Sequence, residues 1–184
     1  EAGASGVSVT TGNNNILIGQ RANAGLGDRS QTIVISSSAG GTSKGNNTGF
    51  INPNGGGVYQ GNNSSSWSTT SDRRIKKNIE DNNIGLAEIM QVQVKNFEYR
   101  TPDEITDWSG SDVDAVVVNK QGTQLGVIAQ EIQTVLPDMV KTEDTGCMSV
   151  DPDNMTWYLV NAVKELKTEL DAAKQRIADL EGEN

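Results

Sequence analysis

The chain has 184 residues, a formal net charge of −9 and no histidine. The missing histidine excludes Ser-His-Asp and Cys-His catalysis and every histidine-ligated metal site. A single cysteine excludes an intrachain disulfide, and the acidic balance argues against nucleic acid, because phosphates bind concentrated basic faces. Nucleophilic chemistry near neutral pH would therefore need a lysine or a perturbed carboxylate as its base, and we expect no metal and no cofactor.

Charge divides the chain near residue 71. Residues 1–70 carry three basic and two acidic side chains, whereas residues 71–184 hold the other 12 basic and 22 acidic ones. The sequence has no signal peptide, no apolar run long enough to cross a membrane and no lipidation motif, so we expect no membrane insertion. Because the chain begins with glutamate rather than methionine, we expect it to be a fragment of a longer protein.

Asparagine-rich turns punctuate residues 1–70. Gly-Asn-Asn occurs three times, with spacings of 33 and 16 residues, and these residues tolerate the positive φ of tight turns. Between the turns, short strands are predicted over 15–19, 31–35, 48–51 and 58–59. A disordered linker is the alternative, but solvated linkers rarely concentrate aliphatic residues in short runs. We therefore predict an all-β stalk, in which several chains intertwine and bury strand residues against one another.

Residues 71–150 show the mixed pattern of a compact α+β domain. Ser71 has the local sequence of a helix N-cap, with an acidic residue directly after it. Two strands are predicted over 115–118 and 124–128, joined in a hairpin by the turn at 119–122. A helix with one apolar face follows over 129–136, and Pro137 ends it.

The last part of the chain, about 152–182, is predicted to be a long helix that begins after the cap Asp151. Its apolar residues step by four and three over more than three heptads, which predicts a coiled coil. The alternative is an amphipathic helix packed on its own domain. The residue types at the two core positions do not select three strands, because β-branched residues alternating with leucine lean towards two. The seam consists of Leu159, Val163, Leu166, Leu170, Ala173, Ile177 and Leu180.

Four stretches, in this order, resemble one family. They are 71–79 (SDRRIKKNI), 94–100 (VKNFEYR), 126–132 (GVIAQEI) with Leu136-Pro137, and 162–166 (AVKEL). The chain resembles the self-cleaving C-terminal intramolecular chaperone of bacteriophage tailspikes and tail fibres, of which the endosialidase tailspike is the best-known bearer. The similarity covers residues 71 to about 180. It departs from the usual pattern after Val150-Asp151, where an aromatic residue is common and Pro152 stands here.

The resemblance implies a homotrimer in which residues 71–184 align three chains and let the stalk of residues 1–70 wind together. The chaperone then cuts between Thr70 and Ser71 and is released. In the family a Ser-Lys dyad performs the cut, and it corresponds to Ser71 and Lys76. The implied setting is a phage tail fibre, folded in the cytoplasm of the host bacterium, whose mature form meets a bacterial surface receptor.

The residues around the implied cut have the chemistry that it needs. Ser71 follows the scissile bond, so its hydroxyl can attack the Thr70 carbonyl through a strained five-membered ring, and water can hydrolyse the ester that forms. Lys76 must be neutral to accept the proton, a form that burial and neighbouring cations favour; Arg73, Arg74 and Lys77 are the cations within reach in sequence. A five-residue separation does not place the pair on one helix face. We therefore expect a turn around Ser71, or a site assembled across chains.

Two further residues of the third motif are candidate helpers. Gln130 is a candidate oxyanion donor, which acyl chemistry needs. Glu131 is a candidate for orienting Lys76, although it has an equally good structural interpretation. Two other functions compete with self-cleavage: a non-cleaving structural or receptor-binding fibre tip, and a Ser-Lys protease that acts on other chains, which would need a substrate cleft and membrane access.

Overall fold

A computed structural model describes residues 11–19, 21–37, 41–54, 56–109 and 112–182. The chain separates into two compact units, Glu1–Ile79 and Glu80–Asn184. No helix in the described residues is long and apolar enough to span a membrane.

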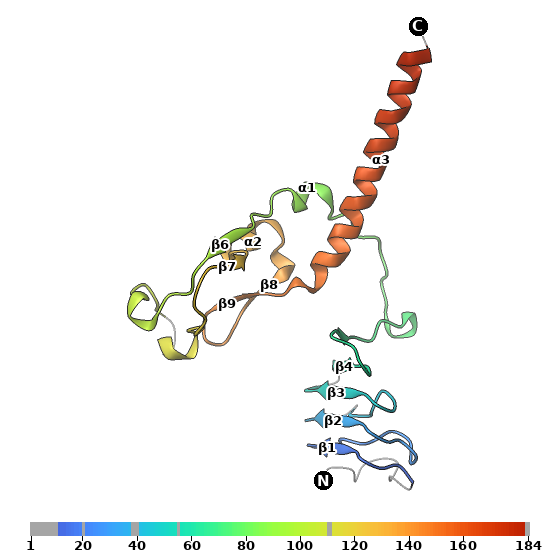
Figure 1. The fold of residues 1–184 in the computed structure, drawn as a ribbon, viewed down its shortest axis with the longest axis vertical. Helices are drawn as coiled ribbons and strands as arrows, with labels where there is room; N and C mark the ends of the chain where they lie inside the picture. The colour runs from blue at the N-terminus through green and yellow to red at the C-terminus, as the bar shows by residue number, and fades with distance from the viewer. Residues whose placement is uncertain (1–10, 20, 38–40, 55, 110–111, 183–184) are drawn as a thin grey trace. The chain divides into compact units, whose positions relative to one another are not determined.

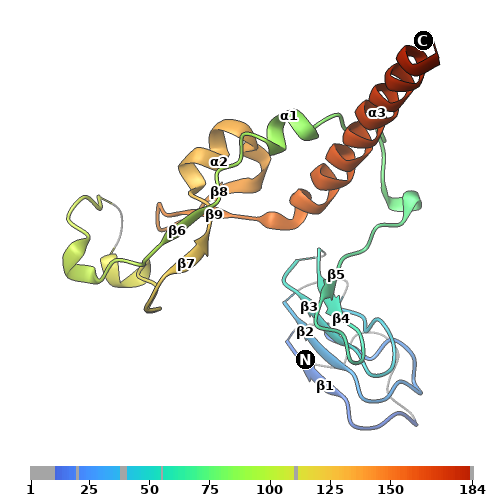
Figure 2. The same ribbon diagram turned by 45° about the horizontal axis from the view of Figure 1, so that its top comes forward.

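The first unit is a ladder of short strands. β1 (Ile16–Ile18), β2 (Ile33–Ser36) and β3 (Gly49–Asn52) are parallel, and β4 (Val58–Gln60) and β5 (Trp67–Ser68) continue the same sheet in antiparallel pairs. Figures 1 and 2 show the first three strands following one another as successive rungs. Ile16 pairs with Ile33 and Ile33 with Gly49, so consecutive rungs lie 17 and 16 residues apart. Such stacking of successive short repeats is typical of β-solenoids.

The rung length explains the spacing of the asparagine-rich turns. Asn14, Asn47 and Asn63 have the expected positive φ, at 55°, 58° and 54°. Gln31 takes the same conformation, at 60°, in the intermediate turn that lacks the Gly-Asn-Asn sequence. The spacing of 33 residues is therefore two rungs. Successive turns are hydrogen-bonded, since Gln31 N donates to Asn13 O at 2.9 Å.

The two faces of this sheet differ. Leu17, Val34, Phe50 and Tyr59 are aligned across β1 to β4 and form the unit's own small core with Ala22. The chain thus supplies part of the core that we expected other chains to provide. The opposite face carries five exposed isoleucines, which we call the isoleucine ladder: Ile16, Ile18, Ile33, Ile35 and Ile51.

The second unit packs short elements against the start of a long helix. Its strands form two antiparallel pairs, β6 (Lys95–Phe97) with β7 (Gln124–Gly126) and β8 (Val140–Thr142) with β9 (Met148–Val150). Its helices are α1 (Leu86–Ile89), α2 (Ala129–Val135) and α3 (Met155–Gly182). The core centres on Ile132, Leu136, Met139 and Tyr158.

Most of the predicted elements are present, and one prediction is wrong. The helix at 129–136 is α2, and Pro137 starts the 3-10 turn that follows it. No hairpin joins 115–118 to 124–128: a 3-10 turn occupies Val113–Ala115, and β7 pairs with β6. Asp112 caps that turn by accepting a hydrogen bond from Asp114 N at 3.2 Å. The local cap and the distant strand partner outweigh the β-propensity of the valines.

The long helix uses two different faces. Tyr158 and Ala162 are buried against the unit, and the Glu165 carboxylate accepts a hydrogen bond from Leu86 N at 2.7 Å. The heptad seam lies elsewhere: Leu159, Val163 and Leu166 are exposed by 45%, 64% and 49%. Figure 1 shows the later turns of α3 extending beyond the rest of the unit. Packing on its own domain therefore does not account for the seam.

Candidate functional site

The candidate site lies between β5 and the end of the first unit. Thr70 and Ser71 follow β5 outside any helix or strand, and both are exposed. A single 3-10 turn over Arg73–Ile75 comes next, closed by hydrogen bonds from Ile75 N to Asp72 O and from Lys76 N to Arg73 O. This is the turn expected from the five-residue separation of Ser71 and Lys76.

The turn brings the two predicted catalytic side chains together. Lys76 Nζ donates a hydrogen bond to Ser71 Oγ at 2.7 Å. Once the amine is neutral, the same two atoms are placed for Oγ–H to give its proton to Nζ, as in a nucleophile and its general base. Both residues are exposed in the single chain. Their catalytic role stays a prediction, which the geometry permits.

The cap of the turn is Asp72 rather than Ser71. Its carboxylate accepts hydrogen bonds from Arg74 N at 2.8 Å and Arg74 Nε at 3.0 Å, and from the terminal guanidinium nitrogen at 2.7 Å. The Arg74 side chain and then its backbone N–H hold the pKa of Asp72 below its usual range. The local expectation that Ser71 caps a helix is therefore wrong, which leaves the hydroxyl to Lys76.

The contact of Arg74 differs from the prediction. From its position in the sequence we expect Arg74 to be one of the cations that favour a neutral Lys76, whereas its guanidinium is bound by the Asp72 carboxylate. The capping role of Asp72 has a signal in the sequence, because an Asp side chain commonly accepts a hydrogen bond from the backbone N–H two residues later. The arginine contact had no such signal.

Gln130 and Glu131 lie in the second unit, at the start of α2. Gln130 is exposed and lines an open pocket of about 490 Å³ with Phe97, Tyr99 and Trp108. Glu131 forms an ion pair with Lys95, at 2.6 Å, and its second carboxylate oxygen is buried without a hydrogen bond in the described residues. Glu131 is thus engaged by a lysine other than Lys76.

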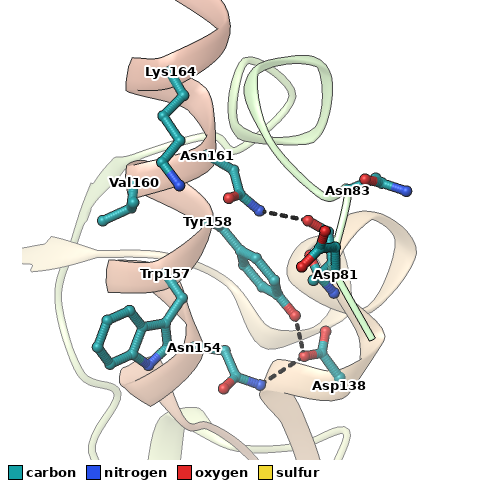
Figure 3. A pocket seen from close by; sticks show the side chains of 10 residues that line it. Asp81, Asn83, Asp138, Asn154, Trp157, Tyr158, Val160, Asn161 and Lys164 are labelled. Carbon is teal, nitrogen blue, oxygen red and sulfur yellow. Dashed lines mark hydrogen bonds between the residues drawn. The ribbon is translucent and has the colours of Figure 1, made fainter. Parts of the chain in front are cut away.

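A polar cluster anchors α3 near its start (Figure 3). Tyr158 Oη donates to the Asp138 carboxylate, which also accepts from Asn154 Nδ2 at 2.8 Å. Burial of the ring, and then the hydrogen bond to Asp138, raise the pKa of Tyr158 to about 12. Asn161 adds bonds to the carbonyls of Asn82 and Ile84. These groups line an open pocket of about 850 Å³ and fix the helix to its unit.

No group of three histidine, cysteine, aspartate or glutamate side chains within the described ranges is arranged to hold a metal ion. The site's chemistry, as far as the structure describes it, is that of a hydroxyl and an amine next to a peptide bond.

Comparison with known proteins bears on the segment that begins at this site. Residues 71–141 match the model of the family described as chaperone of endosialidase, which is classed by name as a peptidase. The match starts at Ser71 and includes Lys76, Gln130 and Glu131. No curated protein matches the chain.

Proposed function

We propose, on the premise that residues 71–141 belong to the chaperone of endosialidase family, that this chain trimerises a fibre stalk and then cuts itself between Thr70 and Ser71. Membership gives the coarse function, an intramolecular chaperone at the C-terminal end of a phage tail protein. Trimerisation and self-cleavage are our extension of it. One observation carries the proposal of self-cleavage: Lys76 Nζ lies 2.7 Å from Ser71 Oγ, directly after the bond to be cut.

The proposed cut proceeds in two steps. Ser71 Oγ attacks the Thr70 carbonyl carbon while its proton passes to neutral Lys76 Nζ. The tetrahedral intermediate collapses, the bond from the Thr70 carbon to Ser71 N breaks, and the Lys76 ammonium returns the proton to that nitrogen. Water then hydrolyses the Thr70–Ser71 ester, which leaves a carboxylate on Thr70 and a free hydroxyl and amine on Ser71.

Self-association is supported at both ends of the chain. The seam of α3 and the isoleucine ladder of the first unit are exposed apolar rows that the single chain does not cover. Both rows repeat regularly, so that identical copies can pack along them. We propose that three copies do so. The exposure of Ser71 and Lys76 in one chain is consistent with a site that becomes enclosed only when copies assemble.

A denaturing gel of the freshly folded full chain tests this function. We expect two fragments of about 70 and 114 residues, lost in Ser71→Ala and in Lys76→Ala. Asp112→Ala is the matched control, since it changes a polar residue of the other unit and should leave the cut unaffected. A single uncut band from the unmutated chain would instead favour the non-cleaving fibre tip.

A further inference from the structure

We propose that Asp72 and Arg74 are positioning residues of the Ser71–Lys76 pair, acting by closing the 3-10 turn that returns Lys76 to the hydroxyl. This inference rests on the proposed self-cleavage and adds to it two residues that do not touch the reacting bond.

The pair needs a turn to meet at all. In extended chain, five residues span about 17 Å, which is further than a lysine side chain reaches. Lys76 itself is extended, with φ −111° and ψ 144°, and so is Asp72, with φ −72° and ψ 133°. The change of chain direction that brings Lys76 Nζ within hydrogen-bond distance of Ser71 Oγ therefore lies in Arg73–Ile75.

Within the described residues, side-chain packing does not stabilise this turn. None of its three residues is buried, and Ile75 is 70% exposed. Its two backbone hydrogen bonds have lengths of 3.2 Å and 3.1 Å. A turn this short is marginal on backbone bonds alone, because fixing its dihedral angles costs more than one or two hydrogen bonds return.

The Asp72 carboxylate supplies the missing restraint. It binds the backbone N–H of Arg74, which caps the turn, and also two nitrogens of the Arg74 guanidinium. Exposed ion pairs usually contribute little, but bidentate arginine–carboxylate geometry is the exception. Here both ends of the ion pair lie in the element that must be held, so it acts directly on the distance between Nζ and Oγ.

The test is the rate of self-cleavage of the full chain, followed by pulse labelling during cell-free synthesis. Asp72→Ala removes the cap and the ion pair, and we expect the rate constant to fall by about 10- to 100-fold, the scale of a small misplacement of a catalytic group. Asp72→Asn keeps a capping oxygen and should slow the cut less. Arg74→Lys keeps the charge but not the bidentate contact, so its rate constant should also lie between those of the wild type and Asp72→Ala.

Asp112→Ala is the matched control, because Asp112 caps the 3-10 turn Val113–Ala115 through the same kind of bond. If Asp72 is a positioning residue, Asp72→Ala lowers the rate constant of the cut but leaves the final cleaved fraction near complete. The shape of the pH–rate profile is preserved, because Lys76 remains the base.

The outcomes separate this inference from the function it rests on. If the unmutated chain stays uncut, both fail. If it is cut, and Asp72→Ala is cut as fast as Asp112→Ala, only the positioning role is wrong. A lower final fraction with an unchanged rate constant would mean that Asp72 serves folding, and would equally overturn the positioning role.

Discussion

The isoleucine ladder gives the sharpest test of the proposed association between copies of the first unit. Ile35 lies in the middle of the ladder, between Ile18 and Ile51, and is 40% exposed in the single chain. Burying a whole isoleucine side chain contributes about 1.5–3 kcal/mol. Covering the exposed 40% of Ile35 therefore contributes about 0.6–1.2 kcal/mol per chain, or about 2–4 kcal/mol in a trimer with three such contacts.

Ile35→Ala should remove that contribution, and Ile35→Asp should add the cost of burying a charge. The assay is equilibrium urea dissociation of the full chain, followed by sedimentation, in a Ser71→Ala background that keeps the chain whole. Leu26→Ala is the control, because Leu26 is 52% exposed but lies outside the strands. Equal midpoints for the Ile35 and Leu26 variants would refute the proposal that the ladder is an interface between copies.

Three further predictions concern the second unit. Leu166→Asp, on the exposed seam of α3, should prevent trimers in sedimentation experiments, because the charge would enter a coiled-coil core. Gly85→Ala should weaken the docking of α3 by about 1.5–3 kcal/mol in urea unfolding, since the added methyl would lie 2.2 Å from Glu165 Oε1 and displace the carboxylate from its backbone donor. The raised pKa of Tyr158 means that its contribution to stability is complete below about pH 10, the ordinary value. This contribution should fall as the pH rises through about 12. The free energy of unfolding, measured over this pH range, should therefore decrease in the unmutated chain but not, through this group, in Tyr158→Phe.

Local sequence patterns predicted the elements that depend on local chemistry. β1 to β4 lie where short strands were predicted between the turns, whereas β5 was not predicted. α2 follows from one apolar face closed by Pro137. The turn at Gln31 escaped prediction because glutamine has no special preference for positive φ; its conformation is imposed by the rungs on either side.

Pairings between distant segments were harder to predict. The run at 115–118 has strand propensity, but β7 instead pairs with β6, about 30 residues earlier in the chain. Propensity describes a residue's fit to a sheet surface and does not choose the partner. The same limit applies to Glu131, whose ion pair with Lys95 depends on that tertiary arrangement.

At the candidate site, the family resemblance pointed to Ser71 and Lys76, and their spacing predicted a turn but not what holds that turn. Spacing alone showed that Ser71 and Lys76 could not share a helix face. The Asp72 cap has a local sequence signal, but the contact of its carboxylate with the Arg74 guanidinium has none, and together they bring three donors to one carboxylate.

Intact-mass measurement of the freshly folded full chain tests the central claim most directly. The account predicts two products, one ending at Thr70 with a free carboxylate and one beginning at Ser71 with a free amine. It also predicts a single uncut mass for Ser71→Ala and for Lys76→Ala. An uncut mass from the unmutated trimer, or cleavage that persists in both variants, would contradict it.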